Sequence, residues 1–593
     1  MRVQVSKSKN SETFYIIKSF RDKETKKNTS KIVERLGTRQ ELEAKLGHDV
    51  DIMAWAKARA EVLTEEEKQG TKRITLELNP TTRIESGIRK KFCGGYLFLQ
   101  SIYHELGLDD ICADITKRHS YKFDLDAILS RLVYGRVLSP SSKTSTCRFS
   151  ETLIEPPTFS DHQVFRSLEV LAKENNFIQS KLYKNSKKVV PRRDKILYYD
   201  CTNFFFEVEE ADGFRNYGRS KEHRPNPLVQ MGLFMDASGM PLACHIDPGN
   251  TNEQTTLIPL EEKILEDFSL SKFIVCTDAG LSSQANRKFN SVKNRQFITT
   301  QSIKTLKAHL KKWALDTSGW YVCGSNDTFN LTDIEEILDS EKTDQTTHDV
   351  LFNKTFYKER MIKEKVGGEK EYFEQRLIVT FSFKYQAYLR SVRQGQIERA
   401  LRALEKDSSR IDRKGNNDFR RFIEKKSATQ EGEVADITTY AINEKTIAKE
   451  AQYDGFYGLC TSLDDDDIEG ILRVNANRWE IEECFRIMKS DFKARPAYLS
   501  RKDRIEAHFL TCYIAFLVFR ILEKKLGDKY TCSQILDTLK DIDFKEVRGE
   551  GFEPLYTRTE LTDDLHDAFG FHTDYEIMTN KAMKEIIKKT KKA

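Results

Sequence analysis

Two aspartates follow short apolar segments in the middle of the chain. Asp200 comes after Ile-Leu-Tyr-Tyr, and Asp278 comes after Phe-Ile-Val-Cys-Thr. Both segments are typical of buried strands, where an uncompensated charge is costly. Carboxylates gathered at such strand ends can bind a divalent cation. For each residue taken alone, an aspartate in a turn just past a strand is an equally good explanation.

A third acidic residue, Glu482, lies in a segment with helical spacing. Glu482, Phe485 and Lys489 follow Arg478 by four, seven and eleven positions. At about 100° per residue, these side chains share one stripe of an α-helix. An exposed ion-paired helix face, with Arg478 and Glu482 as an i, i+4 pair, is the alternative. A flank of apolar residues argues against full solvation: Trp479, Ile481, Cys484 and Ile487.

Three carboxylates that converge within a few ångströms can hold two divalent cations. Mg²⁺ and Mn²⁺ prefer oxygen ligands, and two such ions about 3.5 to 4 Å apart stabilise the attacking and leaving oxygens of a phosphodiester. Asp200, Asp278 and Glu482 therefore form a candidate site for metal-dependent phosphoryl transfer.

The elements around these residues predict how they are brought together. Between Pro191 and about residue 300 we predict strands at Ile196–Val208, Leu228–Met235, Pro241–Ile246 and Phe273–Cys276, and helices at Asn252–Phe268 and Ser282–Val292. Three strands, a helix, a strand and a helix open a ribonuclease H-like fold. The chain returns with a strand at Gly455–Thr461 and helices at Ile468–Phe492 and Ile505–Leu526.

These patterns predict an α/β protein with six segments. The ribonuclease H-like catalytic core comprises residues 191–300 and 455–526 and is split by a large insertion at 301–454. Residues 1–90 are expected to form an N-terminal β-hairpin and helix module, with a charged turn at 21–28. Residues 91–190 are a helical, candidate DNA-binding domain, and residues 527–593 are a C-terminal helical tail.

The segment around Glu482 resembles the signature of the large bacterial insertion-sequence DDE transposases. That signature is Tyr-x-x-Arg-x-x-x-Glu-x-x-x-x-x-x-Lys, and Arg478, Glu482 and Lys489 are in register with it, whereas Asn475 stands at the tyrosine position. Downstream, Arg495-Pro496 and an Arg-Ile-x-x-His element at 504–508 are similar to the same family.

Other segments carry the same resemblance. The loop after Asp200 is similar to the family's Tyr-Gly-x-Ser-Lys-x-x-Arg-Pro, Gly-x-Pro and Pro-Gly-Asn motifs, at 217–225, 239–241 and 248–250. Gly280 follows Asp278 by two residues, as in the family's second-aspartate motif. The opening hairpin, the run Leu132–Lys143 and Tyr453–Phe456 resemble one branch of the family.

The resemblance implies an activity and roles for individual residues. A transposase of this class cuts DNA at the inverted repeats that end its element and joins the freed ends to target DNA. Asp200, Asp278 and Glu482 would hold two Mg²⁺ or Mn²⁺ ions, and four residues would contact DNA: Lys221, Arg224, Arg478 and Lys489. A catalytically inactive DNA-binding relative and a nuclease of the same fold without strand transfer are the competing functions.

Composition permits DNA as a partner without requiring it. The chain has 97 basic and 92 acidic residues, a net charge of +5, so local patches decide phosphate affinity.

The eleven cysteines occur singly and are expected to be reduced. The longest apolar stretch, Tyr513–Phe519, is too short for a bilayer, and no signal peptide is evident. We expect a cytoplasmic protein without a membrane partner, which binds two DNA ends as a homodimer or larger assembly.

The helical segment 94–185 is our candidate for recognition of the terminal repeats. Residues 148–174 have the pattern of a helix-turn-helix motif, with Arg148 and Arg166 as basic residues. A plain helical scaffold explains the same pattern equally well. A core position is the more common role for a histidine on an apolar helix, and we expect it for His508.

Overall fold

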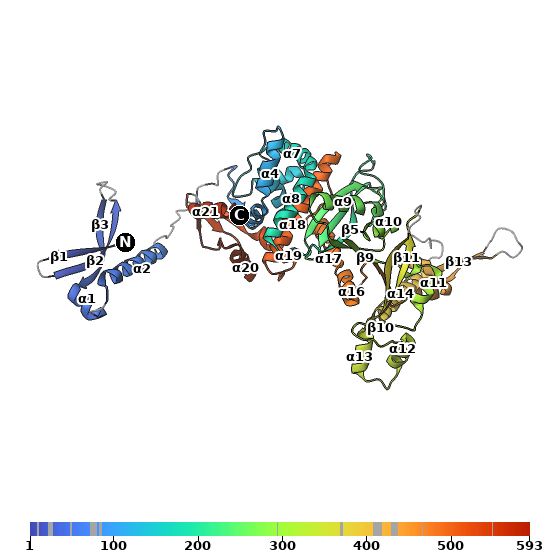
Figure 1. Cartoon of the computed structure of the whole chain (residues 1–593). Coiled ribbons are helices and arrows are strands. Elements are labelled where there is room, and N and C mark those ends of the chain that lie inside the picture. The colour runs from blue at the N-terminus through green and yellow to red at the C-terminus, as the bar shows by residue number, and fades with distance from the viewer. Residues whose placement is uncertain are drawn as a thin grey trace. The chain divides into compact units, whose positions relative to one another are not determined.

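The computed structural model divides the chain into two compact units, Met1–Ile88 and Arg89–Ala593 (Figure 1). It describes residues 1–592 except 9–10, 22–27, 48–49, 71–79, 82, 84–85, 293, 368–371, 407–417, 429–436, 465–466 and 548.

The first unit is a three-stranded antiparallel sheet followed by two helices. The elements are β1 (Arg2–Ser8), β2 (Ser11–Arg21), β3 (Asn28–Thr38), α1 (Arg39–Leu46) and α2 (Ile52–Gly70). The predicted hairpin is confirmed as β2 and β3, and β1 adds a strand that we did not predict. Most of the predicted turn, residues 22–27, lies outside the described residues. Phe14, Leu42 and Ile52 form the small core that joins helices and sheet.

The second unit is built on a nine-stranded mixed sheet. Its strands are β5 (Ile196–Phe205), β6 (Leu228–Asp236), β7 (Pro241–Pro248), β8 (Phe273–Thr277), β9 (Arg295–Thr300), β10 (Tyr321–Val322), β11 (Phe356–Lys365), β12 (Tyr372–Phe381) and β15 (Phe456–Thr461). Five of them lie in the order β7-β6-β5-β8-β9, with β5, β8 and β9 parallel and β6 antiparallel to both its neighbours. This is the predicted ribonuclease H-like arrangement.

The insertion extends this sheet. Strand β15 pairs antiparallel with β9 on one side and with β12 on the other, and β11 and β10 continue the sheet outward. The insertion also carries α11 (Ala308–Leu315), α12 (Leu331–Asp339), α13 (Gln345–Asn353), α14 (Phe383–Lys406), β13 (Ile423–Ala428), β14 (Ile437–Ile442) and α15 (Glu444–Ala451). Trp320, Phe356 and Phe381 are buried in a separate core there.

A helical layer lies between residues 96 and 189 and packs on the apolar helix α18 (Lys502–Lys525). Its helices are α3 (Tyr96–Glu105), α4 (Leu108–Arg118), α5 (Leu125–Leu138), α6 (Lys143–Ser150), α7 (Asp161–Lys173) and α8 (Asn175–Val189). Helix α18 contacts α3, α5, α7 and strand β7. It is long and apolar enough to cross a membrane, but most of its residues are buried inside the protein, as in the core helix of a soluble domain.

Between β15 and α18, the predicted helix Ile468–Phe492 is divided. The structure has α16 (Ile468–Ala476), a turn, α17 (Trp479–Arg486) and a π-helical turn at Ile487–Asp491. Two short helices, α9 (Leu257–Asp267) and α10 (Gln284–Phe289), complete the predicted core elements.

The C-terminal segment was predicted to be helical, and the structure adds strands to it. Its elements are α19 (Cys532–Asp541), β16 (Asp543–Val547), β17 (Gly551–Pro554), α20 (Glu560–Phe569), β18 (Met578–Thr579) and α21 (Asn580–Thr590). These strands form a four-stranded sheet with β4 (Lys91–Cys93). The segment is therefore joined to the start of the second unit by backbone hydrogen bonds, because β16 pairs with β4.

Candidate active site

Asp200, within β5, and Asp278, directly after the neighbouring strand β8, are close enough for the charge of Asp278 to act on Asp200. Strands β5 and β8 are parallel, with Tyr198 opposite Cys276. Extending this register by two residues puts Asp200 opposite Asp278, and neighbouring strands lie about 4.8 Å apart. Asp200 lies within β5, as in the predicted strand Ile196–Val208, whereas Asp278 directly follows β8.

The environment of Asp200 disfavours its negative charge. Burial raises the pKa of Asp200 to about 6, and the charge of Asp278 adds to this shift. The Lys221 ammonium, with Nζ 4.0 Å from Oδ1, and the backbone N–H of Cys201, 2.8 Å from Oδ1, oppose it. The carboxylate is thus only partly compensated by the groups of the protein.

Glu482 is presented by a helix that packs on the same face of the sheet. Side chains alternate along a strand, so Asp200 shares the face of Tyr198 and Phe204, which belong to the same core as Ile481 and Phe485 of α17. The Tyr198 hydroxyl donates to the carbonyl of Val474 at 3.0 Å and ties β5 to the preceding helix α16. The Glu482 side chain is 67% exposed, so it is open to a ligand.

Arg478 connects the third carboxylate to the sheet. Its guanidinium lies 3.8 Å from Glu482 and donates to the hydroxyl of Thr300, at the end of β9, at 3.1 Å. Its charge also lowers the pKa of Asp200, against the larger effect of burial. One arginine therefore acts electrostatically on Asp200 and Glu482 together.

Comparison with known families assigns the chain. The family model described as Transposase DDE domain matches residues 193–518, more than half of the chain and the range that holds all three carboxylates. The chain belongs to this DDE transposase family. Its members are enzymes that use divalent metal ions. No curated protein matches the chain.

Solved structures give weaker likenesses to the transposase. A piggyBac transposase synaptic complex with hairpin DNA has a TM-score of 0.33 and 11% identity over 78% of this chain and 81% of that chain. The Mos1 mariner paired end complex with Mn has a TM-score of 0.13 and 13% identity, over 44% and 70%. The Mos1 strand transfer complex has a TM-score of 0.12 and 16% identity, over 42% and 67%.

Lys489 of the transposase lies inside a π-helical turn that the sequence did not predict. The α-helix that carries Glu482 and Phe485 ends at Arg486, and the π-helical turn Ile487–Asp491 follows it. Lys489 is 3.4 Å from Glu222 and only 16% exposed, with its ammonium over the ring of Phe204. The flank also differs from prediction at Trp479, which is 60% exposed.

Two acidic residues that the sequence did not single out lie at this site. Glu222 accepts from Arg495 at 2.8 Å as well as pairing with Lys489. Glu253 is 3.6 Å from Lys221, which thus lies between Glu253 and Asp200. Both acids neighbour the resemblance motifs at 217–225 and 248–250, the only signal in the sequence that could have indicated them. The Arg224 guanidinium lies over the ring of Phe205.

At the position of the signature tyrosine, Asn475 contacts a tyrosine from another element. Its side-chain amide donates to the hydroxyl of Tyr457, on β15, at 3.2 Å. Tyr457 in turn is hydrogen bonded to Thr300 at 2.8 Å, the same hydroxyl that accepts from Arg478. Asn475 and Tyr457 thus help to fix the end of β9 and the position of Arg478.

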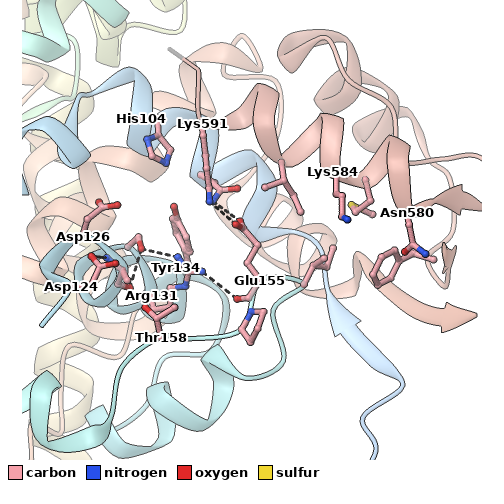
Figure 2. Close-up of a pocket in the computed structure, with 18 residues that line it drawn as sticks. His104, Asp124, Asp126, Arg131, Tyr134, Glu155, Thr158, Asn580, Lys584 and Lys591 are labelled. Atoms are coloured by element: carbon pink, nitrogen blue, oxygen red, sulfur yellow. Dashed lines mark hydrogen bonds and ion pairs between the residues drawn. The ribbon is translucent and has the colours of Figure 1, made fainter. Parts of the chain in front are cut away.

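Another pocket of the transposase lies between α5 and α21 (Figure 2). It has a volume of about 650 Å³, and an ion pair between Glu155 and Lys591 at 2.5 Å crosses its edge. A group of possible metal ligands, His566, His572 and Asp574, also lies in the C-terminal segment, where Arg558 already pairs with Asp574. Neither feature shares a residue with the three carboxylates.

The raised pKa of Asp200 predicts a pH-dependent gain in stability when this charge is removed. Because the folded pKa is about 6 against an ordinary 3.8, the contribution of Asp200 is fully present below pH 4 and is lost as pH rises through 6. We expect Asp200→Asn to stabilise the protein in EDTA at pH 8 by on the order of 1–3 kcal/mol, and to have little effect at pH 4. Thermal unfolding at both pH values measures this, and an equal effect at both would contradict it.

Proposed function

We propose that this transposase cuts DNA at the ends of its element and joins the freed 3′ ends to target DNA, using Asp200, Asp278 and Glu482 as the metal-binding residues. The observation that supports the proposal is the parallel register of β5 and β8, which puts Asp200 opposite Asp278 when it is extended by two residues. Helix α17 adds Glu482 on the same face. Three carboxylates from two strands and a helix are the ligand set that phosphodiester chemistry requires.

The donor set fits Mg²⁺ or Mn²⁺. All three ligands are carboxylates, which are hard oxygen ligands, and the pKa of Asp200 is raised because its charge lacks sufficient compensation. Two bound ions would supply activation of the attacking oxygen and stabilisation of the leaving oxygen. Lys221, which neutralises Asp200 and Glu253 in the protein alone, is then available for a phosphate.

Four basic residues are proposed to bind the DNA backbone near the carboxylates: Lys221, Arg224, Arg478 and Lys489. Lys489 is paired with Glu222, so in this proposal it must break that ion pair before it can bind a DNA phosphate. The helical segment 91–190 is proposed to recognise the terminal repeats. Because two DNA ends must be held together, we propose a homodimer or larger assembly in the cytoplasm, bound to the nucleoid.

Replacing Lys489 by Ala is expected to weaken binding to end DNA and to lower the slope of log Kd against log salt by about one, because one fewer counterion is released. Binding measured across a salt series tests this. Lys581→Ala, at an exposed lysine of α21, is the control and should leave the slope unchanged. A lower melting temperature with an unaltered slope would mean that Lys489 serves only its ion pair with Glu222.

Cleavage by the transposase is expected to require Mg²⁺ or Mn²⁺ and to fail with Ca²⁺ alone. Ca²⁺ has longer, looser coordination and does not hold the two oxygens in the required geometry. Cleavage assays in each cation, after removal of metal with EDTA, test this expectation. Full turnover with Ca²⁺ alone would contradict the two-metal site.

Two other functions are separated from this one by experiment. A catalytically inactive DNA-binding relative would bind ends without cutting them in any cation. A nuclease of the same fold would cut but would not join a pre-cut end to a second duplex. A strand-transfer assay with a pre-cut end therefore distinguishes all three, and a joined product is the result that we expect.

A further inference from the structure

Two motifs that the catalytic site does not use meet at one small pocket. The run Leu132–Lys143 contributes Arg136 and Lys143, and the Arg-Ile-x-x-His element contributes His508. All three side chains are more than nine-tenths buried. The pocket has a volume of about 120 Å³ and is also lined by Ser141, Ser142, Thr144, Phe165, Pro496, Ala497, Tyr498 and Leu499.

These residues hold the segment that follows the Glu482 helix. Arg136 donates to the carbonyls of Phe492 and Lys493, both at 3.1 Å. His508 donates from Nε2 to the carbonyl of Ala494 at 2.9 Å, and its Nδ1 accepts from Lys143 at 3.2 Å. The histidine is thus neutral and packed in the core, as we predicted.

The pocket carries positive charge without an acidic partner. Among the described residues, no carboxylate lies within 4 Å of Arg136 or Lys143, whereas the buried Arg192 and Arg393 pair with Asp236 and Asp454. Burial and the charge of Arg136 lower the pKa of Lys143 to about 7, so an anion at this point would restore the charged form. Arg136 lines the pocket, and its Nε is buried without a hydrogen-bond partner.

The N-terminus of α6 adds to this positive potential. Ser142 caps the helix, and the first residues, Lys143 and Thr144, lie at the pocket. The first N–H groups of a helix have no partner within it, and the helix dipole favours an anion there. The rim carries Tyr498, which is 69% exposed. An exposed aromatic ring beside an anion site is suited to a nucleotide, whose base or sugar can pack on it.

We infer that this pocket binds a phosphate group of the DNA backbone, with Lys143, Arg136 and the N-terminus of α6 as the ligands. The segment 492–499 carries Arg495, which shares Glu222 with Lys489, and its residues 496–499 line this pocket, so the pocket is connected in the chain to the basic residues proposed to bind DNA. The inference rests on the proposed function, because it takes DNA as the ligand.

The test is the full-length chain with Lys143→Met, which keeps the length of the side chain and removes its charge. The control is Lys581→Met, at an exposed lysine of α21 that lies outside the segment proposed to bind DNA. Duplexes made from the DNA that flanks the reading frame serve as the probe, in a salt series. We expect Lys143→Met to weaken binding about 5-fold and to lower the salt slope by about one, with the control unchanged.

A melting temperature at or above that of the wild type shows that the Lys143→Met protein is folded. An unchanged affinity and salt slope in that folded variant would overturn the inference. Arg136, Lys143 and His508 would then serve only to hold the segment that follows the Glu482 helix. Inorganic phosphate, compared with chloride at equal ionic strength, separates the two sources of phosphate. Inorganic phosphate could raise the melting temperature of the wild type and not that of Lys143→Met, while the two proteins bind DNA equally well. In that case the ligand is a free anion, and the assignment to the DNA backbone is wrong. Failure of the wild type to bind the flanking DNA would instead count against the proposed function.

Discussion

Substituting any one of the three carboxylates, as Asp200→Asn, Asp278→Asn or Glu482→Gln, is expected to reduce cleavage of end DNA by more than about 10³-fold. Each change removes a metal ligand while nearly preserving the shape of the side chain. Binding to the same DNA should stay within about 2-fold of the wild type, because no basic side chain that contacts phosphate is changed. Cleavage rates and binding affinities of each variant, measured in Mn²⁺ and Mg²⁺, test both halves of this expectation.

Glu483→Gln is the matched control for the third carboxylate. Glu483 lies on the same helix as Glu482, but it pairs with Arg486 at 2.6 Å instead of with Arg478. Its substitution should leave cleavage within a few-fold of the wild type. If Glu482→Gln cleaved at the wild-type rate, or if Glu483→Gln were the inactive variant, the assignment of the third ligand would be wrong.

The largest loss of stability is expected from Arg192→Met. The Arg192 guanidinium pairs with Asp236 at the end of β6, and both side chains are fully buried. The same guanidinium also donates to the hydroxyl of Ser186 and to the carbonyls of Met240 and Pro241. Removing the arginine leaves a buried, unpaired carboxylate, which costs about 3–5 kcal/mol. Denaturant unfolding of the two proteins measures this loss.

A second substitution identifies the cause of that loss. The double variant Arg192→Met with Asp236→Leu removes the uncompensated charge and should recover most of the stability. Arg193→Met, at the exposed neighbouring arginine, should change stability by less than about 0.5 kcal/mol. If the double variant were no more stable than Arg192→Met, lost packing and backbone contacts, not the charge of Asp236, would explain the effect.

Local patterns were sufficient to predict the core of the fold. Apolar alternation located β5, β6, β7 and β8, and their order fixed the ribonuclease H-like arrangement. Strand β9 was missed because its sequence, Arg-Gln-Phe-Ile-Thr-Thr, is short and half polar. In the structure it is an interior strand that pairs with β8 on one side and β15 on the other. Pairing between strands that are distant in the sequence depends on the whole fold, and the local periodicity of apolar residues does not predict it.

The relative positions of site residues could be predicted only where the residues lie on a single helix or strand. The spacing of Arg478, Glu482 and Phe485 along one helix is readable from the sequence, and the structure retains it. Lys489 lies inside a π-helical turn, Ile487–Asp491, which no residue type in that segment indicates. Glu222 comes from a loop and Glu253 from a short 3-10 helix, and both meet their basic partners only through the tertiary structure, so their roles could not be derived from spacing.

The position of β15 has a consequence for synthesis of the protein. Asp200 and Asp278 leave the ribosome long before Glu482, and β9 has no partner on its outer edge until β15 follows the whole insertion. An unpaired edge of this kind invites wrong pairing between chains. The nascent chain therefore has an open edge for the time needed to translate the insertion. In the proposed assignment, Glu482 is the last of the three carboxylates to be synthesised, so we expect a chain interrupted before α17 to be unable to cut DNA although it carries Asp200 and Asp278.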